Sequence, residues 1–253
     1  MEKKIAFITG ATSGIGWSTA IQMAEVGYAI IGCGRRSERL DELEEALPEG
    51  TPFHPLTFDV SKKADVYKAI DSLPADWKKI DVLINNAGNA HGLDFIHEGN
   101  VDDWDAMMDI NVKGLLYVSK KIIPGMVERR SGQVINIGSI AGKEVYPRGN
   151  VYCGSKYAVD AITKGMRIDL NPYGIKVMGI HPGMVETEFS LVRFKGDEDR
   201  AKTTYQGYDA LTADDIADII VFAVTRPAHV VMADVLVLPL DQASTMVINK
   251  KTS

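Results

Sequence analysis

A glycine-rich run near the amino terminus constrains the fold of this chain more than any other feature. The run TGATSGIG, residues 9–16, follows a short apolar segment of β character, Ile5–Ile8, and precedes a helical pattern that extends to Gly27. Small residues between a strand and a helix let the backbone approach a pyrophosphate, which binds the N–H groups at the helix start. Three glycines alone are a weak signal, but this placement favours a dinucleotide site over a turn that merely packs. The residues expected to contact the dinucleotide are Thr9, Gly10, Thr12, Ser13, Gly14, Ile15 and Gly16.

Segments of strand and helix character alternate along the rest of the chain. Further strands are predicted at Tyr28–Cys33, Phe53–Phe58, Asp81–Asn85, Val134–Ile137, Lys176–His181 and Val235–Leu238. Helices are predicted at Glu38–Leu47, after Ser61, at Val101–Arg130, from Tyr152 to Leu170, and after the capping residue Thr212. Residues 184–211 are polar and irregular, as expected of a substrate lid. Because no linker divides the pattern, we expect a single doubly wound Rossmann-type α/β domain over residues 1–253, with a central parallel sheet and helices on both faces.

Composition and charge argue against several classes of protein. Of the 253 residues, 45% are hydrophobic and 25% are charged, which is ordinary for a soluble globular protein. A net charge of −6 argues against nucleic-acid binding, and no apolar run reaches the roughly 18 residues of a membrane span. The two cysteines, Cys33 and Cys153, are a poor basis for a disulfide framework, and glycines from Gly10 onward interrupt any signal peptide. We therefore expect a cytoplasmic protein without nucleic-acid or membrane partners.

A tyrosine and a lysine four residues apart carry the most specific chemistry. Tyr152 and Lys156 lie one turn apart on the same face of a predicted helix, where the ammonium group can lower a phenol pKa that is ordinarily about 10. Such pairs also occur on ordinary solvated helices, so the pair alone is weak evidence. Ser139, after the strand that precedes this helix, can donate to the oxygen that the tyrosine protonates. Two donors that converge on one oxygen predict carbonyl reduction or alcohol oxidation, which requires a hydride carrier.

The segment after the second strand predicts which dinucleotide is bound. In NAD-dependent sheets an acidic residue about 20 residues beyond the glycine turn binds the ribose 2′-hydroxyl. Here that place holds Gly34, Arg35 and Arg36, and the guanidinium groups can bind a 2′-phosphate, although two solvated loop arginines are the alternative. NADP is therefore the expected cofactor. An aspartate at Gly34, combined with removal of the Arg35 side chain, is expected to shift the preference toward NAD.

With these segments in place, the chain resembles the short-chain dehydrogenase/reductase family over nearly its whole length. The similarity rests on TGATSGIG from Thr9, NNAG from Asn85, Asn111, Ser139, the Tyr152/Lys156 pair and PG at Pro182. Within the family, the runs GRRSERL, PGMVERR, GNVYCGSK, EFSLVRFKGD and RPAHV resemble the NADP-dependent 3-hydroxy acid dehydrogenases that act on serine and allo-threonine. The resemblance implies a homotetramer, and apolar residues on several sides of the Tyr152 helix also indicate a subunit contact.

The resemblance implies a role for each matching residue. Tyr152 would transfer the proton, Ser139 would hold the substrate oxygen, and Lys156 would depress the phenol pKa and bind the ribose hydroxyls. Asn111 would hold a water that links the lysine to solvent, whereas a lone asparagine in a helix is usually a solvated residue. Besides Tyr152 and Lys156, the implied cofactor contacts are Asp59, Val60, Asn86, Ala87, Gly88, Pro182, Gly183, Val185 and Thr187.

The expected substrate carries a charge of its own. A 3-hydroxy acid has a carboxylate near the reacting carbon, and a closed site must pair that charge. Arg148, just before the Tyr152 helix, and Arg193, in the predicted lid, are the candidates, although each is equally plausible as an exposed loop cation. No metal is expected, because His91 and His97 lack the spacing of metal ligands and no cysteine assists them.

Three functions remain open on the sequence alone. The favoured one is the oxidation of a small 3-hydroxy acid, such as serine, allo-threonine, 3-hydroxyisobutyrate or 3-hydroxypropionate, or the reverse reduction. A reductase of 3-oxoacyl groups or other carbonyls would use the same catalytic residues, but the short polar lid favours the small acid. A non-catalytic dinucleotide-sensing protein would need a broken catalytic set, and Ser139, Tyr152 and Lys156 are all present.

Overall fold

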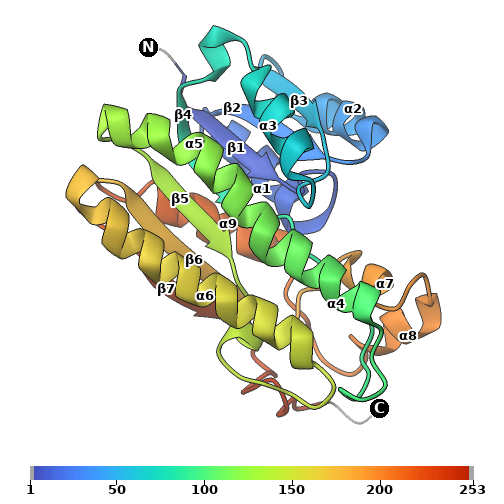
Figure 1. Cartoon of the computed structure of the whole chain (residues 1–253). Coiled ribbons are helices and arrows are strands. Elements are labelled where there is room, and N and C mark those ends of the chain that lie inside the picture. Colours follow the sequence, from blue (N-terminus) through green and yellow to red (C-terminus); the bar gives the residue numbers. More distant parts are fainter. Residues whose placement is uncertain (1–2, 251–253) are drawn as a thin grey trace.

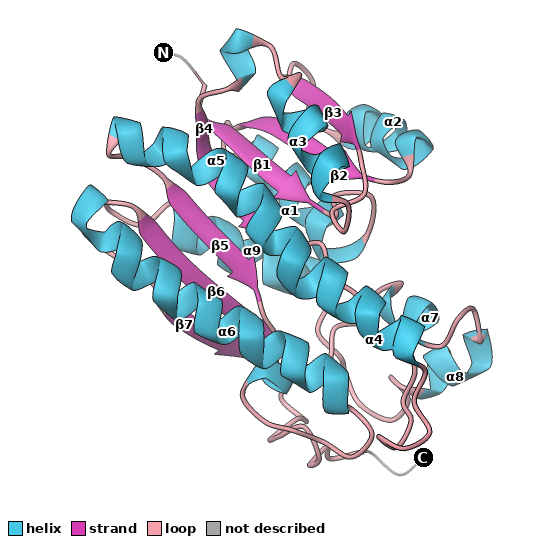
Figure 2. Ribbon diagram, in the orientation of Figure 1, coloured by secondary structure: helices cyan, strands magenta, loops and turns pink. Residues whose placement is uncertain are grey.

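Strands and helices alternate along residues 3–250, the part of the chain that the computed structural model describes (Figures 1 and 2). The strands are β1 (Ile5–Thr9), β2 (Ala29–Gly34), β3 (Phe53–Thr57), β4 (Ile80–Asn85), β5 (Gln133–Ile137), β6 (Lys176–Pro182) and β7 (Asp234–Val237). They pair in parallel in the order β3-β2-β1-β4-β5-β6-β7. Because the order runs outward in both directions from β1 and β4, the predicted doubly wound sheet is confirmed.

Helices cover both faces of the sheet, as the sequence predicts. The helices are α1 (Gly14–Glu25), α2 (Ser37–Ala46), α3 (Lys63–Asp71), α4 (Val101–Met108), α5 (Leu115–Arg129), α6 (Asn150–Leu170), α7 (Phe189–Arg193), α8 (Glu198–Thr203) and α9 (Ala213–Val224). Figure 1 shows α1 and α9 together behind the sheet and α5 and α6 in front of it. Within residues 3–250, none of these helices has the length and apolarity needed to cross a membrane.

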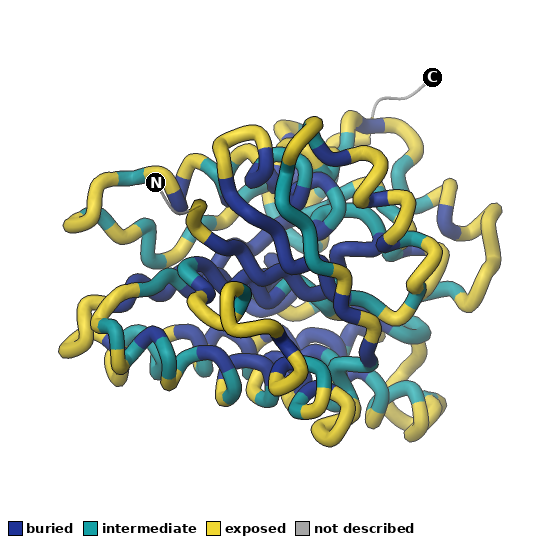
Figure 3. The backbone as a smooth tube through the Cα atoms, turned by 90° about the horizontal axis from the view of Figure 1, so that it is seen from above, coloured by how far each residue is buried: buried dark blue, intermediate teal, exposed yellow. Residues whose placement is uncertain are grey.

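Alternate residues of each strand enter two separate cores. Ile8 of β1 and Ile84 of β4 belong to the core that α1, α2 and α9 complete, with Met23 among its largest buried side chains. Phe7 and Leu83, on the opposite faces of the same strands, belong to the core that α3 and α5 complete. The strands form the buried centre of the molecule (Figure 3). A parallel sheet covered on both faces buries both sides of its central strands, which is why a strand such as Ile5–Thr9 is almost wholly apolar and buried at every position.

The single helix predicted over Val101–Arg130 is interrupted. α4 ends at Met108, and residues Asp109–Gly114 form a π-helical segment before α5 begins. The glycine that ends this segment lies against Val60: a Cβ there would be 3.0 Å from the Val60 carbonyl oxygen. A π turn holds an extra residue and rotates the side chains that follow it, and Asn111 is buried within it. The apolar periodicity on both sides of the segment conceals this interruption.

The lid predicted as irregular over residues 184–211 contains two short helices, α7 and α8. The Asp197 carboxylate caps α8 by accepting a hydrogen bond from the backbone N–H of Arg200 at 3.0 Å. Helices of one or two turns show too few apolar positions for a periodicity to be recognised. The predicted cap at Thr212, by contrast, is confirmed, because Thr212 forms a capping box with Asp215 at the start of α9.

Candidate active site

A cavity of about 650 Å³ opens at the carboxyl ends of the strands, where the strand order reverses between β1 and β4. Its volume is typical of sites for organic ligands. Most of the predicted site residues line it: Gly10, Thr12, Ser13, Gly14, Ile15, Arg35, Arg36, Asp59, Val60, Asn86, Ala87, Gly88, Ser139, Tyr152, Lys156, Pro182, Gly183, Val185, Thr187 and Arg193. The predicted residues that do not line it are Thr9, Gly16, Asn111 and Arg148.

The glycine-rich turn forms a cradle at one end of the cavity. Gly10 and Gly14 have positive φ angles of 69° and 52°, which favour glycine. A Cβ at Gly16 would overlap the Gly10 carbonyl oxygen, so Gly16 lets α1 pack closely on the turn. Ser13 and Ile15 at the start of α1 face the cavity. The cradle thus fits a pyrophosphate at the positive end of the α1 dipole.

Thr9 supports this turn from behind. It is 2% exposed, and its hydroxyl accepts hydrogen bonds from the backbone N–H groups of Asn86 and Ala87, both at 3.0 Å. The Asn86 side chain donates in turn to the carbonyl oxygens of Thr9, at 2.9 Å, and Gly10, at 3.2 Å. Its hydroxyl thereby joins the ends of β1 and β4, and the cofactor contact of Thr9 stays a prediction.

The arginines after β2 meet both the glycine turn and the lid. Arg36 donates to the Thr12 carbonyl oxygen at 3.2 Å and pairs with the Glu188 carboxylate at 3.1 Å. Arg39 donates to the same Thr12 oxygen at 3.3 Å and lies 3.7 Å from the second Glu188 oxygen. Arg35 lines the cavity beside them. The sequence prediction missed Arg39 and Glu188; Arg39 follows Arg36 at helical spacing, but nothing local indicates Glu188.

The predicted catalytic side chains converge where β5 approaches α6. Tyr152 and Lys156, both buried, lie one turn apart on α6. Ser139 follows β5 and lines the same cavity as Tyr152, and its hydroxyl accepts a bond from the Ala141 N–H at 3.0 Å. Lys156 Nζ donates to the Ile137 carbonyl oxygen at 3.0 Å. A phenol and a hydroxyl are thereby presented to one point of the cavity, an arrangement suited to protonating a carbonyl oxygen.

Burial controls the pKa values of the tyrosine and the lysine. It raises the pKa of the Tyr152 phenol well above its usual value and Tyr146 adds to this, while the hydrogen bond with Ser139 and the charge of Arg193 lower it only in part. Burial also lowers the pKa of Lys156 to about 8. Arg193 is thus one of the groups that lower the phenol pKa, and the lowering by Lys156 stays a prediction. The ammonium group is directed to a backbone carbonyl, and its own burial disfavours its charge.

Asn111 lies behind the catalytic side chains and connects two elements. Its Oδ1 accepts from the Asn89 N–H at 2.8 Å, and its Nδ2 donates to the Asn89 carbonyl at 2.8 Å and to Ser155 Oγ at 3.0 Å. These bonds tie the loop after β4 to α6. A Cβ at Gly88 would lie 3.2 Å from Asn111 Oδ1 and 3.4 Å from Lys156 Nζ, so the two polar groups flank one small space. The water-holding role of Asn111 stays a prediction.

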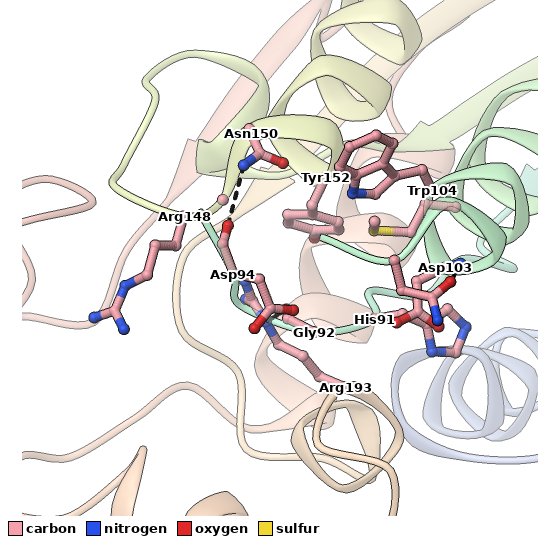
Figure 4. A pocket seen from close by; sticks show the side chains of 12 residues that line it. His91, Gly92, Asp94, Asp103, Trp104, Arg148, Asn150, Tyr152 and Arg193 are labelled. Atoms are coloured by element: carbon pink, nitrogen blue, oxygen red, sulfur yellow. Dashed lines mark hydrogen bonds between the residues drawn. The ribbon is translucent and has the colours of Figure 1, made fainter. Parts of the chain in front are cut away.

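The two candidate carboxylate-binding arginines differ in position (Figure 4). Arg193, at the end of α7, places its guanidinium 5.6 Å from the centre of the Tyr152 ring and donates to the Tyr146 hydroxyl at 3.0 Å. Arg148 points away from Tyr152, and its guanidinium lies 5.6 Å from the centre of the Phe95 ring. Of the two, Arg193 is therefore the one brought to the catalytic tyrosine. Tyr146, which orients it, was not predicted because the pairing is made across 47 residues of sequence.

Comparisons with known proteins agree with this geometry. A family model described as short chain dehydrogenase matches residues 4–197. The chain belongs to this family. Its relatives include the NADP-dependent 3-hydroxy acid dehydrogenase YdfG of Salmonella typhi, 44% identical over 240 residues that cover 94% of this chain and 96% of the relative. An NADP-dependent 3-hydroxy acid dehydrogenase of Schizosaccharomyces pombe is 40% identical over 254 residues, 99% and 98% of the two chains.

Solved structures of other short chain dehydrogenases have the same fold. The closed form of a serine dehydrogenase complexed with NADP⁺ is 41% identical and superposes with a TM-score of 0.91, over 96% of this chain and 98% of that one. The serine dehydrogenase from Escherichia coli is 36% identical with a TM-score of 0.82, over 94% and 99%. The predicted Rossmann-type fold and oxidoreductase class are therefore confirmed for this short chain dehydrogenase.

A second polar cluster is formed by His181, Asp160 and Asp234, which do not line the cavity. His181, near the end of β6, is 1% exposed, and its Nε2 lies 2.9 Å from the Asp234 carboxylate and 3.8 Å from that of Asp160. The potential ligand atoms of these three residues are within 4.8 Å of one another, as in a metal site. However, Lys143 pairs with both carboxylates, at 2.7 and 2.6 Å, and Lys164 pairs with Asp160 at 2.6 Å. Ammonium groups thus already occupy the carboxylate oxygens that a cation would need.

The unfolding free energy is expected to decrease as the pH falls from 6.5 to about 4. Burial lowers the pKa of His181 from 6.5 to about 4, with Lys143 acting in the same direction and Asp234 and Asp160 opposing it. In that window the unfolded chain binds a proton that the folded chain does not, so up to about 3 kcal/mol of stability is lost. Urea unfolding above and below this window measures the loss, which should be much smaller in His181→Gln. An equal loss in the variant would assign the pH dependence to other groups.

Proposed function

We propose that this protein is an NADP-dependent dehydrogenase of small 3-hydroxy acids. It oxidises the 3-hydroxyl of an acid of the serine, allo-threonine, 3-hydroxyisobutyrate or 3-hydroxypropionate class, or reduces the corresponding 3-oxo acid or semialdehyde. The observation that carries the proposal is the Arg193 guanidinium beside the Tyr152 ring, because a carboxylate near the reacting carbon needs such a partner. The activities of the relatives that are 44% and 40% identical support it.

Each catalytic side chain in this proposal acts on the reacting substrate or orients the cofactor. The Tyr152 hydroxyl gives a proton to the substrate oxygen in reduction and takes it back in oxidation, while Ser139 donates a hydrogen bond to that oxygen. Because burial keeps the phenol protonated, it is ready to act as an acid. Lys156 binds the ribose hydroxyls of the cofactor. NADP, when bound, supplies or accepts the hydride.

The 2′-phosphate of NADP is assigned to Arg35 and Arg36 in this proposal. Both line the cavity beside the glycine turn, and neither is accompanied by an acidic residue at Gly34. The aspartate suggested for Gly34 is unsuitable as a test, because a Cβ at Gly34 would overlap the Thr12 side chain. Position 35 offers a site for an acidic substitution without that clash.

Arg35→Asp is expected to lower kcat/KM with NADP at least about tenfold and to raise the relative activity with NAD, because it replaces a phosphate-binding cation by an anion that repels phosphate. Steady-state kinetics with both cofactors and one hydroxy acid measures the ratio. Glu42→Asp, a conservative change on α2, the helix that follows Arg35, controls for damage to this region. An unchanged ratio in Arg35→Asp would remove Arg35 from the cofactor site.

The alternative function is a reductase of 3-oxoacyl groups or of other carbonyls. The cation beside Tyr152 favours the small acid over an uncharged ketone. A non-catalytic dinucleotide-sensing protein is disfavoured because Ser139, Tyr152 and Lys156 are brought together in one cavity. Measuring NADP⁺ reduction with serine, allo-threonine, 3-hydroxyisobutyrate and simple secondary alcohols separates these functions. Activity confined to uncharged alcohols would reject the 3-hydroxy acid as substrate. Activity with none of these compounds would favour the non-catalytic dinucleotide-sensing protein.

The proposal also includes a substrate lid, a homo-oligomeric assembly and a cytoplasmic location. Residues 184–211 carry Arg193 over the cavity, which supports a lid that excludes water during hydride transfer. Ile168 of α6 is 74% exposed, and this apolar surface supports the expected homo-oligomer, a tetramer by resemblance. The expected cytoplasmic location rests on the two cysteines, which are a poor basis for a disulfide framework.

A further inference from the structure

The first residues of the lid cross the cradle formed by the glycine turn. A Cβ at Gly14 would lie 3.2 Å from the Thr187 side chain, so the chain at Thr187 passes directly over the turn. The next residue, Glu188, pairs with Arg36 at 3.1 Å and with Arg39 at 3.7 Å. The lid is thereby attached to the start of α2, an element from the other end of the sheet.

The two arginines are in turn attached to the glycine turn. Arg36 donates to the carbonyl oxygen and the hydroxyl of Thr12, at 3.2 and 3.3 Å, and Arg39 donates to the same carbonyl at 3.3 Å. The contacts from Thr187 through Glu188 and the arginines to Thr12 therefore make a closed strap around the cradle. Its members that line the cavity are Thr12, Gly14, Arg36, Thr187 and Glu188.

We propose that Glu188 is a positioning residue that retains the bound cofactor by fastening this strap over its pyrophosphate. The strap rests on the proposed function, because the group that it encloses is the pyrophosphate of a dinucleotide. Two guanidinium groups share the one Glu188 carboxylate, so both arginines hold the lid in place. Both Arg36 and Glu188 are about two-fifths exposed, at 41% and 43%, so water can compete for the pair. An ion pair of this kind is weak enough to open in each catalytic cycle.

Glu42 provides a matched control for Glu188. Its carboxylate also pairs with Arg39, at 2.5 Å, but it lies on α2, three residues away on the same helix. Glu188→Gln and Glu42→Gln therefore remove the same charge from the same arginine. Glu188→Gln also detaches the lid and removes the partner of Arg36. Because a freed Arg36 would bind the phosphates more tightly, faster release confined to Glu188→Gln reports the strap and not the local charge.

The experiment measures the rate of NADPH release by stopped-flow fluorescence, with excess NADP⁺ added to a preformed complex of the whole chain. Glu188→Gln is expected to release NADPH about three- to tenfold faster, as two weak ion pairs are lost, whereas Glu42→Gln should change the rate less than about twofold. Glu188→Asp, which keeps the charge on a shorter side chain, should restore part of the retention. Added salt should speed release from the unaltered protein and bring it toward the rate of Glu188→Gln.

Each of the following results would contradict the proposed role of Glu188. Equal release rates in the unaltered protein and Glu188→Gln would reject it, and so would equal effects of Glu188→Gln and Glu42→Gln. Slower release from Glu188→Gln would show that this carboxylate competes with the 2′-phosphate for Arg36. Failure of the unaltered protein to bind NADPH would reject the proposed function along with the strap, whereas the other results leave the proposed function standing.

Discussion

Tyr152→Phe is expected to lower kcat by about 10²- to 10⁴-fold while NADPH still binds, because it removes the proposed general acid and leaves the ring in place. The ring packs in a buried cluster with Ala90 and Met107 and lies tilted against Phe189, with the ring centres 5.8 Å apart. Phenylalanine preserves those contacts. Only the hydroxyl, which lines the cavity together with Ser139, is lost. Steady-state rates, together with titration of NADPH fluorescence, separate catalysis from cofactor binding.

Tyr146→Phe is the matched control for this prediction. It removes a partly buried phenol hydroxyl from the same cavity, one that accepts a hydrogen bond from Arg193 at 3.0 Å. Its effect should therefore appear mainly in KM for the hydroxy acid, with kcat largely kept. The proton-transfer role of Tyr152 would be rejected if Tyr152→Phe kept a substantial fraction of its turnover, or if both variants lost kcat equally.

Arg193→Ala is expected to raise KM for 3-hydroxy acids by about 10- to 100-fold, which corresponds to the loss of a hydrogen bond to a charged group in a closed site. Activity on an uncharged secondary alcohol of similar size should change little, because that substrate has no carboxylate to lose a partner. Arg148→Ala removes a cation of the same type that points away from Tyr152, and it should alter neither KM. Kinetics of the three proteins with a charged and an uncharged substrate test all of these expectations.

Two results would contradict the assignment of Arg193. Equal losses on charged and uncharged substrates would indicate a damaged lid, because Arg193 also donates to the Gly92 carbonyl oxygen at 3.2 Å and helps to hold that loop. A larger effect of Arg148→Ala would show that the loop before α6 rearranges when substrate binds. Removal of the Arg193 charge should also leave the phenol pKa of Tyr152 higher still, since this guanidinium is one of the groups that lower it.

The predictions that succeeded rest on residues that are close together in the sequence. The order of strands and helices follows from apolar runs and turn residues, each read over a few positions. The glycine turn is recognisable because Gly10 follows β1, and Gly14 and Gly16 lie in the first turn of α1. The pairing of Tyr152 with Lys156 follows from the helical repeat alone. The π-helical interruption at Asp109–Gly114 escaped prediction because it preserves the apolar pattern on both of its sides.

The sequence by itself determined the class of fold, the cradle for a dinucleotide and the presence of a serine, a tyrosine and a lysine able to act on one oxygen. Only the tertiary structure decided which cation lies beside the Tyr152 ring, because Arg148 and Arg193 carry the same charge and differ in the direction that folding gives them. Likewise, the pairing of Arg36 with Glu188 spans 152 residues, a separation over which no local periodicity carries information. The pKa shifts of Tyr152 and Lys156 also depend on the tertiary structure, because burial is their largest cause. The spacing of residues along the sequence does not show how deeply a side chain is buried.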